Sequence, residues 1–194
     1  MPDEWTTIDD EIGRLIAEHG VEKFRDWPVV HRTMLRNASF EENAKWQERH
    51  FFWLEDMGAY YNRVVEIGAG TGQFARLCSD WDDTYIVDLP NIRQIQAYVC
   101  PKAYHAGADI GGDGNTLAVS LWAMSEMPYD VREQYWESFK DCHWFFAFQY
   151  RHNEYRNLDW FLSRAIMSGR RFTVEHIAGA QNNWYMYIDG KREA

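Results

Sequence analysis

The chain has 194 residues, enough to bury one hydrophobic core but too few for two full domains. Its formal net charge is -10 and no stripe of Lys and Arg appears, so a nucleic-acid substrate is not expected. No apolar run approaches the roughly 20 residues of a membrane span, and the three cysteines, spread through apolar segments, are predicted to be reduced buried thiols. These features predict a soluble cytoplasmic protein that acts on a small molecule or glycan.

Residues 1–58 are predicted to form a helical cap ahead of an α/β domain that spans residues 59–194. Apolar residues at helical spacing indicate a first helix that Gly20 can end. A capping box at Ser39 opens a second helix, which stops at Gly58.

The stretch Val64–Gly72 is an apolar, β-branched run that ends at Glu66 and passes into three alternate glycines. It predicts a buried strand that turns sharply into a helix, with glycines where a Cβ would exclude a ligand. A second apolar run ends at Asp88. An acidic residue at the tip of the second strand of a βαβ unit can accept hydrogen bonds from both hydroxyls of a ribose, so a nucleoside-bearing ligand is expected.

The rest of the chain alternates strand and helix. Strands are predicted over 63–67, 84–88, 102–106, 117–122, 144–149, 172–177 and 184–188, and helices over 72–79, 90–98, 129–140 and 157–169. Residues 108–115 are too short and too rich in glycine for the expected crossover helix. The last two strands are predicted to form an antiparallel pair. The fold class is therefore α/β, a Rossmann-like seven-stranded sheet that is mostly parallel, with the last strand antiparallel.

The spacing of the glycines distinguishes between nucleoside ligands. Dinucleotide folds use G-x-G-x-x-G beneath a pyrophosphate, whereas this chain has E-x-G-x-G-x-G. A carboxylate at Glu66 would repel a pyrophosphate but suit a ligand with a sulfonium and an ammonium group. The pattern resembles motif I of the class I methyltransferases, which bind S-adenosyl-L-methionine. A tight turn without any ligand is the simpler alternative.

Three segments, Val65–Gly72, Tyr85–Pro90 and Ser120–Pro128, together resemble the bacterial sugar O-methyltransferase family. The resemblance covers residues 60–155. It implies an S-adenosyl-L-methionine-dependent O-methyltransferase that acts on a sugar or a sugar-containing small molecule. The cofactor-binding residues that it implies are Glu66, Gly68, Ala69, Gly70, Gly72, Asp88, Leu89, Asp109, Ile110 and Trp122.

The chemistry of these residues agrees with the roles that the resemblance implies. Glu66 would hold the ammonium group of the cofactor, and the glycines would allow its methionine part to approach closely. Asp88 would accept the ribose hydroxyls, and Leu89 would pack on the adenine ring. Asp109 would accept the adenine amino group, although a turn residue beside glycines is an equally good interpretation. Trp122 would line the sulfonium.

A sugar hydroxyl is a poor nucleophile at neutral pH, so a base is expected near the carboxyl ends of the strands. The candidates are Glu126, after the fourth strand, and His152, after the fifth. In the simpler interpretation, Glu126 is an acidic residue at the N-terminus of the next helix and His152 is an exposed loop residue. Ser125 would also face the acceptor. An aromatic platform for the acceptor is predicted from Trp122, Tyr150, Tyr155 and Trp160.

The sequence alone leaves two other functions open. A protein that binds the cofactor without transfer activity, as a partner or regulatory subunit, would fit the short chain and its trimmed crossover. A nucleotide-sugar or dinucleotide enzyme is disfavoured by the glycine spacing. No set of metal ligands can be identified in the sequence, so a Mg²⁺ ion bound by acidic side chains is left open. The sequence also leaves open whether the protein forms a homo-oligomer and which molecule accepts the methyl group.

Overall fold

The computed structural model describes residues 17–18, 40–58, 61–79 and 83–191. Of the predicted first helix only Ala17 and Glu18 are described, and both are helical. The rest of that helix and Ser39 of the capping box lie outside the described residues.

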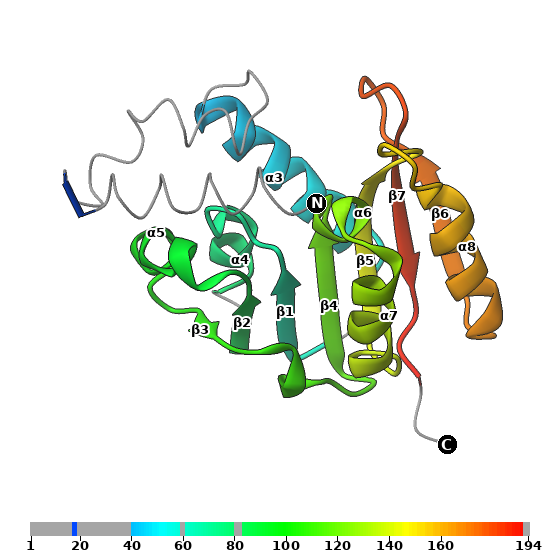
Figure 1. The fold of residues 1–194 in the computed structure, drawn as a ribbon, viewed down its shortest axis with the longest axis horizontal. Coiled ribbons are helices and arrows are strands. Elements are labelled where there is room, and N and C mark those ends of the chain that lie inside the picture. The colour runs from blue at the N-terminus through cyan, green and yellow to red at the C-terminus, as the bar shows by residue number, and fades with distance from the viewer. Residues whose placement is uncertain (1–16, 19–39, 59–60, 80–82, 192–194) are drawn as a thin grey trace.

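The described strands form one seven-stranded sheet in the order β3-β2-β1-β4-β5-β7-β6 (Figure 1). Strands β1 to β5 are parallel, and β7 runs antiparallel to both of its neighbours, β5 and β6. Each predicted strand is present, with small displacements at its ends, and the predicted fold class is confirmed. The bounds are β1 Arg63–Ile67, β2 Asp83–Val87, β3 Tyr104–His105, β4 Thr116–Leu121, β5 His143–Gln149, β6 Phe172–His176 and β7 Asn183–Ile188.

The central strands are nearly continuous apolar runs because helices cover both faces of a parallel sheet. All six residues of β4 are buried, as are the five middle residues of β5. The edge strand β6 is largely exposed. The core therefore lies around β1, β4 and β5, whose carboxyl ends carry the predicted site.

Two helical layers flank the sheet. Helices α3 and α4 pack on one face, in a cluster that includes Leu54 and Phe74. Helices α7 and α8 pack on the other face, in a cluster that includes Trp136 and Phe161. The helical bounds are α3 Phe40–Asp56, α4 Gln73–Cys78, α5 Arg93–Val99, α6 Ala123–Glu126, α7 Tyr129–Ser138 and α8 Asn157–Met167.

Three short segments differ from simple expectation. The helix predicted from residue 90 begins as a 3₁₀ turn, Pro90–Ile92, which leads into α5. The four-residue helix α6 directly follows β4 and is absent from the sequence prediction. Between β3 and β4 the described chain has a 3₁₀ turn, Ala108–Ile110, in place of a crossover helix, which confirms that the crossover is short.

Helix α3, which lies in the predicted N-terminal cap, packs directly on the sheet. Leu54 is buried, and the indole of Trp53 stacks on Phe145 of β5 with ring centroids 5.3 Å apart. Trp53 Nε1 also donates a hydrogen bond of 2.8 Å to Glu175 on the edge strand β6. Helix α3 therefore shares the core of the α/β domain, and a boundary at residue 58 stays a prediction.

Cys78, Cys100 and Cys142 are free and buried, as predicted. Among the helices that the structure describes, none combines the length and the apolar character that crossing a membrane requires.

Candidate functional site

The site lies where the strand order reverses. Strand β1 has β2 on one side and β4 on the other, and in open α/β sheets such a switch point leaves a crevice at the carboxyl ends of the strands. Figure 1 shows the arrowheads of β1 and β4 at the same edge of the sheet. Gly68 follows β1, Asp88 follows β2 and Trp122 follows β4, so the fold brings these predicted residues to one edge.

The glycine turn between β1 and α4 needs glycine for its backbone angles. Gly68, Gly70 and Gly72 have φ values of 69°, 57° and 79°, in the left-handed region that other residues rarely adopt. A Cβ on Gly68 would lie 2.2 Å from the Cβ of Ala123. Gly68 is thus required for packing against α6, whereas the sequence interpretation gives it only a role in ligand approach.

The side chain of Ala69 packs into a small cluster with Ala75, Ile86 and Cys100 beneath the turn. Its carbonyl accepts the Gly72 N–H at 2.9 Å, which closes the turn. Ala69 therefore presents backbone rather than side chain at the site.

Asp88 is tied to the glycine turn. Its Oδ2 accepts hydrogen bonds from the Gly70 N–H at 3.1 Å and from Gln96 Nε2 at 2.8 Å, and its Oδ1 accepts from the Leu89 N–H at 2.7 Å. Gln96 Nε2 also donates to the Gly70 carbonyl at 2.9 Å. Sequence reasoning missed Gln96, although a polar residue on the buried face of α5, next to Ile95, was a visible signal.

Glu66 is buried beneath the turn, where its Oε2 accepts a hydrogen bond of 2.9 Å from the Ala75 N–H in α4. Burial raises the pKa of Glu66 to about 8; the bond from Ala75 opposes the shift, and the negative charge of Asp88 adds to it. At neutral pH this carboxyl is mostly protonated. A neutral Glu66 repels a pyrophosphate less than a charged one would. Its contact with an ammonium group stays a prediction.

The residues predicted to bind adenine lie at the ends of β2 and β3. Leu89 is about half exposed, so its side chain is accessible. Asp109 is exposed in the 3₁₀ turn, and a Cβ on Gly107 would lie 2.5 Å from its Oδ1, so Asp109 folds back over the turn. Ile110 packs partly into the core on the α7 side. Their contacts with adenine stay predictions.

Trp122 has a φ of 67°, which is rare for a non-glycine residue and occurs preferentially at functional sites. Its Nε1 donates a hydrogen bond of 2.8 Å to Asn183 Oδ1 on β7, and its ring meets the edge of His50 on α3 at 5.0 Å between centroids. The indole thus contacts β7 and α3. A role for Trp122 beside a sulfonium stays a prediction.

His50 is a second residue that sequence reasoning missed. It is buried, and its Nδ1 shares a hydrogen bond of 2.5 Å with the hydroxyl of Tyr185. Burial lowers the pKa of His50 to about 3, with a smaller contribution from the positive charge of Arg49, so the imidazole is neutral at physiological pH. His50 helps to attach α3 next to Trp122.

The segment after β4 is mostly buried. Ser125 is buried, and its hydroxyl donates a hydrogen bond of 2.6 Å to the Trp122 carbonyl. The prediction that Ser125 faces an acceptor is therefore wrong, because the short helix α6 turns it inward. Glu126 is only 9% exposed. Its role as a base stays a prediction and requires access at this small exposed surface.

A buried arginine joins the ends of β4 and β5. Arg132 of α7 donates to the carbonyls of Met127 and Ser125, each at 2.8 Å, and to Asn157 Oδ1 at 2.7 Å. Asn157 Nδ2 donates in turn to the Gln149 carbonyl at the end of β5, at 3.0 Å. The guanidinium also lies over the rings of Tyr129, Tyr155 and Trp160, with 5.0, 4.8 and 5.7 Å to the centroids.

Burial lowers the pKa of Arg132 to about 10, so this side chain stays protonated at neutral pH. The positive charge is held by carbonyl oxygens, an amide oxygen and aromatic faces.

His152 lies in the loop after β5 and is partly exposed. Its backbone N–H donates to the Tyr155 carbonyl at 3.1 Å, and the Tyr155 N–H donates back to the His152 carbonyl at 2.8 Å. Arg132 connects this loop to the segment that contains Glu126, because it donates hydrogen bonds to Ser125 and Met127 on one side and to Asn157 on the other. Both candidate bases thus follow neighbouring strand ends, as predicted, and a catalytic role for either is untested.

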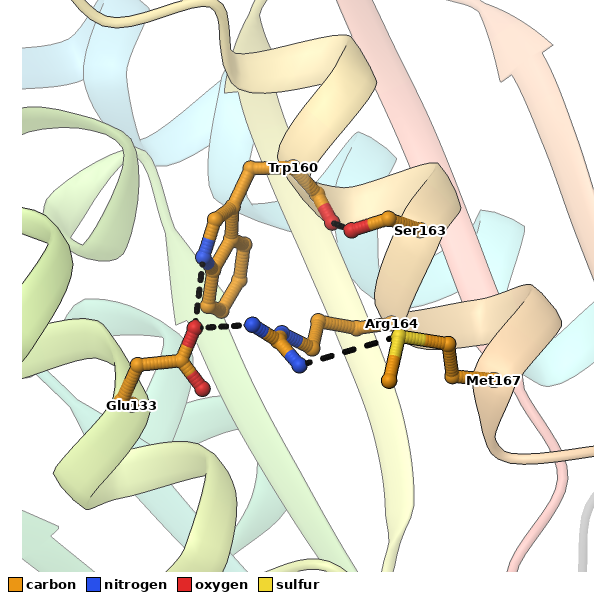
Figure 2. Close-up of polar contacts among 5 residues, drawn as sticks. All are labelled: Glu133, Trp160, Ser163, Arg164 and Met167. Carbon is orange, nitrogen blue, oxygen red and sulfur yellow. Dashed lines mark hydrogen bonds and ion pairs between the residues drawn. The ribbon is translucent and has the colours of Figure 1, made fainter.

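The predicted aromatic platform is not a single surface. Trp122 packs against the cluster on the α3 face of the sheet, whereas Trp160 belongs to the cluster on the α7 face. Figure 2 shows that Trp160 Nε1 donates to Glu133, which also pairs with Arg164. Beside them, a shallow hollow of about 400 Å³ is lined by Tyr129, Glu133, Arg156, Asp159 and Trp160.

Comparison with protein-family models gave no match. Comparison with curated proteins also gave none.

Solved structures do resemble this chain. A TehB-like S-adenosylmethionine-dependent methyltransferase from Corynebacterium glutamicum is 16% identical, with a TM-score of 0.57, over 75% of this chain and 87% of that one. The magnesium protoporphyrin IX methyltransferase of Synechocystis, solved with bound S-adenosylmethionine, is 12% identical, with a TM-score of 0.56, over 94% and 97%. A ribosomal protein L11 methylase from Lactobacillus delbrueckii is 14% identical, with a TM-score of 0.53, over 74% and 77%. These similarities show a shared Rossmann-like fold.

Proposed function

We propose that this protein binds S-adenosyl-L-methionine at the glycine turn and transfers the methyl group to a hydroxyl of a sugar or a sugar-containing small molecule. The main observation in favour of this cofactor is the position of Asp88. Its carboxylate lies at the end of β2, at the switch point of the sheet, and is fixed beside three left-handed glycines. A carboxylate in that place suits the two hydroxyls of a ribose.

The surroundings of the turn favour a cationic ligand over a polyphosphate. From Val64 to Ala75 the sequence has no Lys or Arg that could pair with phosphate oxygens. The turn instead has two carboxyl groups, those of Glu66 and Asp88, close enough for the charge of one to raise the pKa of the other. An ammonium group of the ligand would favour ionisation of Glu66. The structures with a similar fold include one with bound S-adenosylmethionine, which supports the same cofactor here.

The cofactor, when bound, would supply a methyl group activated by its positively charged sulfur. The protein would hold the ribose through Asp88 and would place an acceptor hydroxyl above the ends of β4 and β5. Glu126 or His152 would take the proton of that hydroxyl, because both follow these strand ends. The sugar acceptor is supported by the family resemblance of the sequence and by the exposed rings of Tyr129 and Tyr150 near the same edge.

Titration calorimetry tests the cofactor. S-adenosylhomocysteine should bind, whereas NAD and ATP should not. Asp88→Asn should weaken the binding of S-adenosylhomocysteine by about 1 to 3 kcal/mol, because hydrogen bonds to a charged acceptor are lost. Asp130→Asn, at an exposed position on α7, is the matched control and should bind like the wild type. Preference for NAD, or unchanged affinity of the Asp88 variant, would contradict the proposal.

Turnover tests the acceptor and the base. Methyl transfer from labelled S-adenosylmethionine should be measured with a panel of sugars, nucleotide sugars and phenols. With an acceptor in hand, Glu126→Gln or His152→Ala should lower turnover about 10² to 10⁴-fold while leaving affinity for S-adenosylhomocysteine unchanged. Binding of the cofactor without transfer to any acceptor would instead support the role of a non-catalytic partner.

A further inference from the structure

We infer that Gln96 of α5 is a positioning residue that orients Asp88 for a ribose. This inference rests on the proposed function, since the ribose belongs to the proposed cofactor. Gln96 is fully buried, and neither the glycine motif nor the acidic residue after β2 indicates it from the sequence.

The contacts form a closed arrangement of three groups. Gln96 Nε2 donates to Asp88 Oδ2 at 2.8 Å and to the Gly70 carbonyl at 2.9 Å. The Gly70 N–H donates to the same Oδ2 at 3.1 Å. A helix, a strand end and the glycine turn are thereby linked through a single carboxylate oxygen.

Packing holds Gln96 in this position. A Cβ on Gly72 would lie 3.6 Å from both the Cα and the Cβ of Gln96, so the turn and α5 are in close contact. Two donors on one oxygen set the plane of the Asp88 carboxylate, and Oδ1 then lies on the side of Leu89. A ribose would meet a carboxylate that is already oriented, and such preorganisation reduces the entropy lost on binding.

Burial alone does not explain why position 96 has an amide side chain, as the oxygen end of that amide indicates. Its Oε1 is buried and has no hydrogen-bond partner among the described residues. Rotating the amide would place an oxygen against two acceptor oxygens, so the donor end must face Asp88 and Gly70. An unpaired buried carbonyl costs stability that a methionine of similar length would not cost. The two donated bonds are therefore the reason for an amide at this position.

Gln96→Met tests this role, and Gln94→Met, at an exposed position on the same helix, is the matched control. Thermal melting and calorimetry with S-adenosylhomocysteine should be run on both. Gln96→Met should melt within a few degrees of the wild type but bind S-adenosylhomocysteine about 10 to 100-fold more weakly, because a hydrogen bond to the charged Asp88 and one to the Gly70 carbonyl are lost. Gln94→Met should match the wild type in both measurements.

A double-mutant cycle separates positioning from a general structural role. If Gln96 acts through Asp88, Gln96→Met should change affinity little in the Asp88→Ala background, so that the two effects are strongly non-additive. Additive losses, or wild-type affinity in Gln96→Met, would overturn the inference while leaving the proposed cofactor intact. Absence of S-adenosylhomocysteine binding by the wild type would overturn both.

Should Gln96→Met fail to fold, Gln96→Glu provides a probe of the same shape. At alkaline pH, where this buried carboxyl ionises, it offers no donor and repels Asp88, so binding of S-adenosylhomocysteine should be weak. As the pH falls and the new carboxyl is protonated, the loss relative to the wild type should shrink. A loss that does not depend on pH would overturn the inference.

Discussion

At the residue scale, Gly68 shows that one glycine can meet two separate demands. Its φ of 69° disfavours any other residue, and its Cα faces the Cβ of Ala123 across the ends of β1 and β4. Gly169 also has a left-handed backbone angle, with a φ of 64°, but a Cβ there would have nothing within 4 Å. The two positions therefore separate backbone strain from steric conflict.

Gly68→Ala is expected to lower the free energy of unfolding by about 2 to 4 kcal/mol, from left-handed strain together with a clash. Gly169→Ala should lower it by about 1 kcal/mol, from strain alone. Urea denaturation of both variants measures the difference. Adding Ala123→Gly to Gly68→Ala should restore the steric part, and a double variant as unstable as Gly68→Ala would show that Ala123 is not the obstacle.

Glu66 shows how burial changes the chemistry of a motif residue. The pKa of Glu66 is about 8 in the folded protein and 4.5 as the ordinary value. The folded state therefore binds more protons than the unfolded state between these two pH values. Stability attributable to Glu66 is complete below about pH 4.5 and is lost as the pH rises through about 8.

Glu66→Gln should remove this pH dependence. Between pH 5 and pH 8.5 the variant should gain stability relative to the wild type by on the order of 4 kcal/mol, since each pH unit up to the raised pKa is worth about 1.4 kcal/mol. Urea denaturation at both pH values measures the change. Glu137→Gln, on the exposed surface of α7, is the control and should follow the wild-type pH profile. Parallel profiles for Glu66→Gln and the wild type would contradict the shifted pKa.

At the scale of elements, Arg132 connects α6, α7 and the start of α8. Its three hydrogen bonds end on the segment after β4, which includes α6, and on Asn157, the first residue of α8. Glu126 is the last residue of α6, and His152 lies in the loop between β5 and α8. We therefore expect the relative placement of the two candidate bases to depend on Arg132.

Arg132→Met is expected to destabilise the protein by about 3 kcal/mol or more, because it leaves two buried acceptors and one partly buried acceptor without their donor. Arg156→Met, at an exposed ion pair with Asp159, should change stability by less than about 0.5 kcal/mol. Chemical denaturation of the two variants gives the comparison. An effect of equal size in both would show that the buried network contributes little.

At the scale of the whole molecule, α3 is part of the folding unit that contains the sheet. Its Leu54 is in the same apolar cluster as Val64, Leu117 and Phe145 from three strands. A helix that shares a core with a sheet should unfold together with it. We therefore expect α3 and the sheet to unfold as one cooperative unit.

Leu54→Ala should lower the free energy of unfolding by about 2 to 5 kcal/mol, the usual cost of truncating a buried leucine. Phe52→Ala, on the exposed side of the same helix, should change it by less than about 0.5 kcal/mol. Tryptophan fluorescence and far-ultraviolet circular dichroism should give coincident melting curves for both variants. Separate transitions would indicate that α3 unfolds independently of the sheet.

Local sequence patterns are sufficient for the order of the strands, for the helices between β1 and β7 other than α6, and for the place of the glycine turn. Strand β4 is a continuous run that is buried throughout, and such a run is recognisable without coordinates. The left-handed angles of the turn are accessible to glycine at little cost, so the motif marks the turn correctly. Asp88 is predictable at a strand end because the apolar run of β2 stops just before it.

Which side chains meet depends instead on how distant elements pack together. Gln96 bonds to a residue 26 positions earlier and Arg132 to one 25 positions later. Hydrophobic periodicity reports which face of an element is buried, but hydrogen-bond partners depend on register and packing, which no local pattern encodes. The raised pKa of Glu66 has the same origin, since it follows from burial beneath packed elements and from the charge of Asp88 at the end of another strand.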